Sequence, residues 1–456
     1  MDQAVLNRPA PEKDVRRWHR SSLPANTDRL PDWAYSFVVA NVMAYAFRDT
    51  LTGSLRFYLD KVGLSALWFI PDLMAFICIG IFGLLIVLRS RSVLGFIFLV
   101  NIFTAAIIGA IFMNQSTLAF VTGVKAVIPI FIGLCFAGRS ITERRGPRIF
   151  MFVMMLVSVI GLVLNPHFEY PWVGAEISNF GFTKTVGKLW WDSNGVRYGG
   201  FAGDSTMAAF MVIFPYLMLY RHFPRWGNVA LWPLLYYALD ISTSKTALIL
   251  LMIFIPIYIW LYIINSSMTA EGRRRTVVTL AKLSFIFVIV PFLLIGIFGG
   301  ANLTQYDHSL YSLQDRIDSS WQKPFSTLAD IFPAGLLLGC GLGCFSYPMT
   351  YTEVARYWVP VDNFYLTTYL MLGFPFLIIV IAQAWLVGKV RDEGKLMLIT
   401  LINIYTLTVA CYGPSFATLV VGYTFGDLFL SSSRPWSRQA TNLQDPPPGI
   451  FRSAKA

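Results

Sequence analysis

Three basic residues occupy positions suited to holding a phosphate group. Arg197 and Lys245 each stand at the start of an apolar segment, and Arg316 lies in the long stretch between two later segments. A guanidinium matches a pair of phosphate oxygens, and an ammonium acts as a point charge. The free N–H groups at a helix start add to the attraction for an anion. These residues predict a site for a phosphate or diphosphate.

A carboxylate that could accept a proton stands near them in the sequence. Asp362 directly precedes an apolar segment and could take a proton from a hydroxyl group. The helix dipole and nearby cations predict that this carboxylate is ionised. The same position also suits a helix N-cap, so both roles stay open. The residues expected to line the site or contact an acceptor are Tyr198, Asp204, Asp315, Trp321, Asn363 and Tyr365.

Each basic residue also has a simpler interpretation. Arg197 and Lys245 could extend towards lipid head groups, and Arg316 could pair with Asp315 or Asp318 in a surface loop. The four histidines show no spacing typical of metal ligands, so we expect neither a metal site nor a cofactor.

The composition restricts the class of protein that must position these residues. Hydrophobic residues make up 56% of the 456-residue chain and charged residues 13%, about half the usual share. The mean hydropathy is +0.59. These values exclude a soluble enzyme. The net charge of +11 is divided among short clusters between apolar segments, which argues against a nucleic-acid partner. The sequence predicts an all-α polytopic membrane protein.

Twelve apolar segments between residues 33 and 430 predict a single transmembrane domain of about twelve helices. They cover 33–50, 64–88, 93–113, 117–137, 147–164, 199–220, 226–241, 245–264, 277–299, 363–387, 396–412 and 416–430. Residues 1–32 predict a disordered basic cytoplasmic arm and residues 431–456 a disordered cytoplasmic tail.

The distribution of Lys and Arg predicts the orientation of the chain. With both termini in the cytoplasm, the inner segments hold 24 of these residues and the outer segments 10. Two long loops, at about 165–198 and 300–362, then face outward. The second is rich in aromatic residues, so we expect short helices resting on the membrane surface there.

Several polar residues fall inside the apolar segments. Asp72 and Lys125 are expected at membrane depth, either as an ion pair between helices or as the lining of a cavity open to the outside. Asn41, Asn101 and Asn403 are expected to form hydrogen bonds between helices. We expect all five cysteines, including Cys340 and Cys344, to be buried apolar residues without a redox or metal role.

The order of these features resembles that of a known family over about residues 195–375. The matching features are Arg197–Tyr198–Gly199–Gly200–Phe201, Ser244–Lys245–Thr246, Arg316 with Trp321, Gly339-x-Gly341-x-Gly343, Asp362–Asn363 and Gly373. They resemble the bacterial O-antigen ligase and Wzy-type polysaccharide polymerase family. The resemblance implies a fold of the lipid-dependent glycosyltransferase (GT-C-like) type. It also implies metal-independent transfer of a glycan from a polyprenyl diphosphate to an acceptor hydroxyl at the periplasmic face of the inner membrane.

On this resemblance, Arg197, Lys245 and Arg316 hold the diphosphate, and Asp362 with Arg316 acts in catalysis. Ligases of the family commonly carry His–Asn where this chain has Asp362–Asn363, and Ser–Arg where it has Ser244–Lys245. The missing histidine favours a polymerase that joins polyprenyl-diphosphate-linked oligosaccharide repeat units into an exopolysaccharide, capsule or O-antigen.

The expected partners of such a polymerase are the lipid-linked donor and acceptor, membrane lipid and a chain-length regulator protein. A glycan ligase of the same family and a lipid-linked glycan flippase are the alternatives. The flippase is disfavoured because the buried charges lie mainly in the outer half of the predicted helices and no internal repeat is present.

Overall fold

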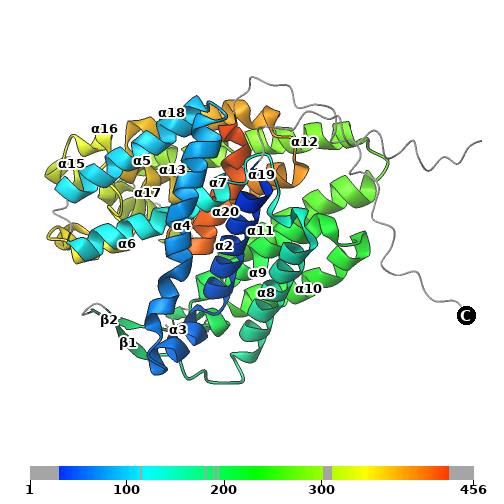
Figure 1. Ribbon diagram of the computed structural model, residues 1–456, viewed down its shortest axis with the longest axis horizontal. Helices are drawn as coiled ribbons and strands as arrows, with labels where there is room; N and C mark the ends of the chain where they lie inside the picture. Colours follow the sequence, from blue (N-terminus) through cyan, green and yellow to red (C-terminus); the bar gives the residue numbers. More distant parts are fainter. Residues whose placement is uncertain are drawn as a thin grey trace, which may run out of the picture.

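The computed structural model describes residues 30–112, 116–179, 182–187, 190–192, 195–300 and 311–430. The predicted tail and almost all of the predicted arm lie outside these residues. The described chain is largely helical (Figure 1).

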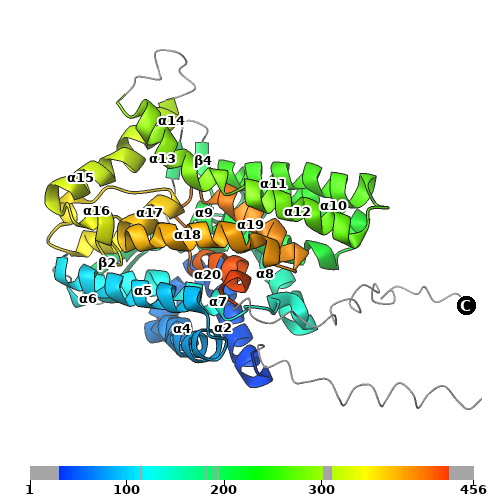
Figure 2. The same ribbon diagram turned by 90° about the horizontal axis from the view of Figure 1, so that it is seen from above.

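Every apolar segment of the sequence forms helix. The helices are α2 (Asp32–Thr50), α3 (Thr52–Lys61), η1 (Ser65–Phe69), α4 (Ile70–Ile81), η2 (Phe82–Leu88), α5 (Val93–Phe112), α6 (Thr117–Val127), α7 (Pro129–Leu134), α8 (Arg145–Leu164), α9 (Ser205–Leu219), α10 (Arg225–Ile241), α11 (Lys245–Tyr258), η6 (Ile259–Ile264), α12 (Ala270–Leu283), α13 (Ile286–Phe298), α17 (Phe364–Leu372), α18 (Phe374–Leu386), α19 (Glu393–Tyr405) and α20 (Ser415–Phe425). In both ribbon views, α10, α11 and α12 lie on the side away from α5, α6 and α15 (Figures 1 and 2).

Several helix boundaries differ from the predicted segments, and two of these differences have clear local causes. The segment at 363–387 divides into α17 and α18 because Gly373 adopts a φ of +71°, which ends one helix before the next begins. The segment at 199–220 begins its helix only at Ser205, since the Asp204 carboxylate caps that end by accepting a hydrogen bond from the Met207 N–H.

Six continuous helical stretches are long and apolar enough to cross a membrane. They are Ser65–Leu88, Val93–Phe112, Thr117–Leu134, Arg145–Leu164, Lys245–Ile264 and Ala270–Phe298. The protein therefore has the character of a membrane-embedded helical bundle. The number of twelve transmembrane helices stays a prediction.

The long second loop carries short helices, as its composition predicts. They are α14 (Tyr311–Asp315), η9 (Arg316–Gln322), α15 (Lys323–Ile331), α16 (Gly335–Leu338), η10 (Tyr347–Tyr351) and η11 (Ala355–Tyr357). A separate core of apolar side chains, including Ile317, Trp321 and Leu328, packs beneath them. The loop is therefore an ordered layer on the bundle.

The first loop contains two β-hairpins that the sequence analysis did not predict. Strands β1 (Glu176–Asn179) and β2 (Phe182–Thr185) pair antiparallel, as do β3 (Trp190–Asp192) and β4 (Gly195–Arg197). This loop lies outside the apolar helical segments, and its aromatic and β-branched residues favour strands. The all-α description therefore holds for the bundle and not for this loop.

One end of the bundle gathers the basic residues predicted to be cytoplasmic. Arg144 pairs with Asp32 at 3.2 Å, and Arg221 with Asp392 at 3.1 Å. Arg273 pairs with Glu393 at 2.9 Å. The β1–β2 hairpin and α3 lie towards the opposite end from α12 and α18 (Figure 1). Segments assigned to one side by charge thus meet at one end, and which end faces the cytoplasm stays a prediction.

The expectation for two of the cysteines was wrong. Cys340 and Cys344 form a disulfide with a Cα–Cα separation of 5.9 Å, whereas Cys78, Cys135 and Cys411 are free and buried. The special backbone that this short bridge needs comes from the neighbouring glycines. Gly341 and Gly343 have φ values of +95° and +85°.

The backbone around Gly341 packs directly against helix α5 of the bundle. A Cβ added at Gly341 would lie 2.1 Å from the backbone nitrogen of Gly109 in α5. The Leu342 N–H donates to the carbonyl oxygen of Ala105 at 3.0 Å. The loop backbone therefore lies directly on α5, with no room for a side chain between them.

Replacing both bridged cysteines by serine tests the disulfide. We expect the double variant C340S/C344S to lose about 2 kcal/mol of stability, because a bridge that closes so few residues removes about that much unfolded-state entropy. In the unreduced, denatured wild-type protein, three of the five cysteines should react with a maleimide, and all five after reduction. Five labels without reduction would contradict the bridge.

Candidate functional site

The centre of the candidate site is an ion pair between two residues singled out in the sequence. The Nε of Arg316, at the start of η9, lies 2.8 Å from Oδ2 of Asp362. The Trp321 indole N–H, one turn further along η9, donates to Oδ1 of the same carboxylate at 2.8 Å. The side chains of Arg316 and Asp362 are 36% and 32% exposed, so a ligand can reach both. The alternative pairing of Arg316 with Asp315 or Asp318 was wrong.

Asp362 is not the N-cap of the helix that follows it. The Asn363 side-chain oxygen accepts the hydrogen bond from the Leu366 N–H at 2.8 Å and caps α17. Its amide nitrogen donates to the carbonyl oxygen of Leu407 at 2.9 Å. Asn363 therefore performs the capping, and the Asp362 carboxylate is left for Arg316 and Trp321.

The surroundings of Asp362 also shift its protonation equilibrium. Burial raises the pKa of the Asp362 carboxyl above its ordinary value, and the nearby Arg316 guanidinium and the Trp321 hydrogen bond offset this only in part. The net shift makes Asp362 a stronger base than an exposed aspartate. A proton acceptor benefits from such a shift.

The segment between α19 and α20 brings several helix starts together beneath this ion pair. The Phe364 N–H, in the first turn of α17, donates to the carbonyl oxygen of Thr406 at 3.1 Å. The hydroxyls of Thr246 in α11 and Thr408 lie 2.7 Å apart. The aromatic ring of Tyr405, the last residue of α19, packs on Phe210 of α9, with ring centres 5.6 Å apart. The first turns of α11 and α17 and the N-terminal half of α9 therefore pack around the end of α19 and the segment that follows it.

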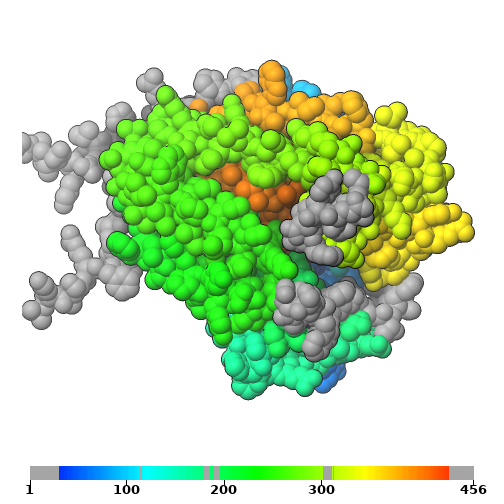
Figure 3. Space-filling view, turned by 180° about the vertical axis from the view of Figure 1, so that it is seen from behind, coloured from blue at the N-terminus to red at the C-terminus, as the bar shows by residue number. Residues whose placement is uncertain are grey.

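A hollow is visible on one face of the molecule. Figure 3 shows green and yellow-green surfaces bordering it, and an orange-red floor built by residues near the end of the described chain.

The two other predicted cations occupy different surroundings. Lys245 is the first residue of α11 and its side chain is exposed. Arg197 ends β4 and is half-buried, and its Nε is buried without a hydrogen-bond partner.

The remaining predicted residues divide into capping, surface and core positions. Asp204 caps α9, and Tyr198 packs partly buried against the main core. Asp315 is exposed and accepts a hydrogen bond from the Ser319 hydroxyl at 3.0 Å. Tyr365 is 2% exposed and donates to the side-chain oxygen of Asn403 at 2.5 Å.

An apolar pocket of about 500 Å³ lies inside the bundle, next to α17. Its walls come from α5, α7, α17, α18 and α20, and they include Phe98, Phe364, Tyr365, Phe376 and Tyr412. The volume includes some space that is open to the surroundings. Its apolar lining suits contact with a hydrocarbon chain.

Sequence reasoning found the ion pair between Asp72 and Lys125, which the structure confirms at 2.9 Å. It missed Arg48, which was counted among the outer loop charges and is instead buried in α2, 2.9 Å from Asp72. It also missed Thr408 and the rest of the α19–α20 segment. The signal was Gly413, Pro414 and Ser415 between the predicted segments 396–412 and 416–430, with two threonines near the end of the first segment.

The chain was compared with protein-family models, curated proteins and solved structures. No protein-family model, curated protein or solved structure matches it. Among the described residues, no three His, Cys, Asp or Glu side chains come close enough to hold a metal ion.

The Arg316→Gln variant tests the electrostatics of this site. Removing the guanidinium should raise the pKa of Asp362 further, because burial would then act with less opposition. Infrared titration of the protonated carboxyl band would measure the shift, with Asp362→Asn identifying the band. In both proteins the carboxyl should keep its proton to a higher pH than an exposed aspartate. A band that moves to lower pH in Arg316→Gln would refute this account.

Proposed function

We propose that the protein is a polymerase that joins polyprenyl-diphosphate-linked oligosaccharide repeat units at the outer face of the inner membrane. The observation that carries the proposal is the partly exposed Arg316–Asp362 pair, which places an anion-binding group and a base within 3 Å of each other. Its membrane-embedded surroundings suit substrates that are themselves anchored in lipid.

The chemistry follows from the two partners of the pair. The diphosphate of the donor competes with Asp362 for the Arg316 guanidinium, and Lys245 and Arg197 add positive charge as the donor enters. Release from Arg316 leaves the Asp362 carboxylate free to accept a proton from the acceptor hydroxyl. The hydroxyl oxygen bonds to the anomeric carbon of the donor as the bond from that carbon to the diphosphate breaks. Charge on the leaving polyprenyl diphosphate is stabilised by the cations.

Several features support this reaction over others. A single displacement inverts the anomeric centre and needs no metal or cofactor. The apolar pocket beside α17 offers an apolar surface that a polyprenyl chain could contact. Aromatic residues of the long loop offer faces for sugar rings, and Trp321 fixes the carboxylate orientation through its indole N–H.

The proposed location follows from charge and redox chemistry. The disulfide between Cys340 and Cys344 is typical of a loop that faces an oxidising compartment such as the bacterial periplasm. The long loop that contains it also carries Arg316. A periplasmic active site with both termini in the cytoplasm agrees with this and with the positive-inside rule.

Arg316→Ala should reduce polymer formation in the host at least a hundredfold, because the variant loses the main charge that stabilises the leaving group. Gel analysis of the surface or secreted glycan measures this, and immunoblotting checks that the variant stays in the membrane. Arg356→Ala removes an exposed arginine from the same loop and should leave the polymer unchanged. Normal polymer from Arg316→Ala would refute the assignment.

Deleting the gene in its host separates the polymerase from its alternatives. We expect single repeat units to remain on the lipid carrier, facing outward, because the joining step is lost. Mass spectrometry of extracted carrier lipids would measure their size. Long glycans stalled on the carrier would instead indicate a ligase, and single units retained on the cytoplasmic face would indicate a flippase.

A further inference from the structure

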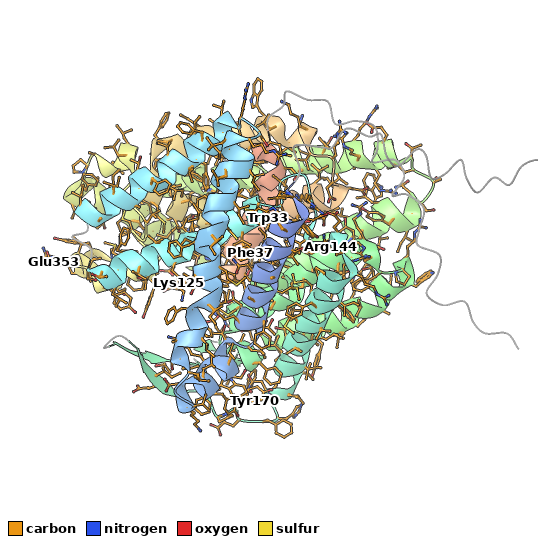
Figure 4. The ribbon with its side chains drawn as sticks, in the orientation of Figure 1. Trp33, Phe37, Lys125, Arg144, Tyr170 and Glu353 are labelled. Atoms are coloured by element: carbon orange, nitrogen blue, oxygen red, sulfur yellow. A yellow bond between two sulfur atoms is a disulfide. The ribbon has the colours of Figure 1, made fainter. Side chains whose placement is uncertain are left out.

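A second basic cluster, which the proposed reaction does not use, lies between α2, α3, η1 and α6. It contains Arg48, Arg56 and Lys125, arranged around two aromatic rings. The guanidinium carbons of Arg48 and Arg56 lie 5.2 Å and 5.4 Å from the ring centre of Trp68. The Lys125 ammonium lies 4.6 Å from the ring centre of Phe69. Figure 4 labels Lys125 on α6, beside α4.

The carboxylates of this cluster are already occupied. Asp72 accepts a hydrogen bond from the Tyr45 hydroxyl at 2.7 Å and forms ion pairs with Arg48 and Lys125 at 2.9 Å each. Asp49 pairs with Arg48 at 3.3 Å and accepts from a backbone N–H of α20 at 2.6 Å. Two acidic groups therefore face three cations.

Arg56 is the cation left over. Among the described residues, no carboxylate lies within 4.0 Å of its guanidinium. Asp60, one turn further along α3, is exposed and accepts a hydrogen bond from Ser65 at 3.0 Å. Burial and the charge of Arg48 lower the pKa of Arg56, so its cationic form has a free-energy cost that a bound anion would relieve.

A pocket stands directly beside this guanidinium. It is a shallow depression that opens to solvent, and it is lined by Arg56, Leu59, Ser65, Trp68 and Phe69. It thus combines a guanidinium, a hydroxyl and two aromatic walls. A hydroxyl and a guanidinium are typical ligands of phosphate oxygens.

The cluster lies at the same end of the bundle as the Arg316–Asp362 pair. Arg48 donates at 2.6 Å to the hydroxyl of Ser415, the first residue of α20, which follows the segment beneath that pair. Thr52, which begins α3, contacts Met207 in the first turn of α9.

We infer that the pocket at Arg56 binds the diphosphate of a second polyprenyl-linked substrate, the acceptor. This inference rests on the proposed function, because a polymerase joins two substrates that each carry a lipid diphosphate. One diphosphate leaves at Arg316 while the other stays bound at Arg56 throughout the reaction. The second site anchors the acceptor and takes no part in bond breaking.

Equilibrium binding of labelled farnesyl diphosphate, a short polyprenyl diphosphate, tests the inference. The full-length protein in phosphatidylcholine nanodiscs should bind two molecules per chain. Arg56→Gln should weaken one site roughly tenfold to a hundredfold, as expected for a lost charge-assisted hydrogen bond, and leave the other unchanged. Arg316→Gln should do the reverse. Lys61→Gln removes a cation from the same helix, where it lies over Phe57, and should leave both sites intact.

The following outcomes would contradict the inference or separate it from the proposed function. Two unchanged sites in Arg56→Gln would overturn the inference. Inorganic pyrophosphate binding there as tightly as farnesyl diphosphate would also overturn it, since the pocket would then serve a free anion. The proposed function fails separately: if the host deletion leaves the glycan size unchanged while Arg56→Gln still loses one site, the binding site stands without the polymerase.

Discussion

Charge buried in an apolar bundle needs a partner, and this need fixes much of the arrangement. Arg48 in α2 contacts Asp72 in α4 and Ser415 at the start of α20, and Asp72 in turn binds Lys125 in α6. Four helices are thus held in register by contacts that cannot slide without exposing an unpaired charge to a low dielectric. Breaking one such contact by removing a partner typically costs 3–5 kcal/mol. The position of the start of α20, next to the candidate site, therefore depends on the contact between Arg48 and Ser415.

At the candidate site, too, a charged group has a partner of opposite charge. The free-energy cost of desolvation is lower there because both side chains are partly exposed. Arg316 and Asp362 neutralise each other in the absence of substrate, yet both stay about one-third exposed. On the proposed function, an incoming diphosphate would exchange one partner of Arg316 for another, so the site would never hold an isolated charge. Trp321 keeps the carboxylate in place during that exchange through its hydrogen bond.

The sequence predicted the helical class, the apolar segments and the Asp72–Lys125 pair, because apolar runs and intramembrane charges are local signals. It did not predict the β-hairpins, the Cys340–Cys344 bridge or the buried position of Arg48. Each of these depends on which residues meet in three dimensions. Likewise, Asp362 and Asn363 are adjacent and both suit a helix start, and only the backbone geometry decides that Asn363 is the cap. The pairing of Arg316 with Asp362, 46 positions later, has no local signature at all.

The contact between Gly341 and Gly109 has a consequence for exchanging parts among related proteins. With the two backbones touching, the long loop and α5 form one mechanical unit. A loop transplanted from another chain would fit only if its matching glycine and the small residue of α5 came with it. Grafting experiments on this loop should therefore move it together with the middle of α5, or leave the glycine turn in place and replace only the short helices beyond it.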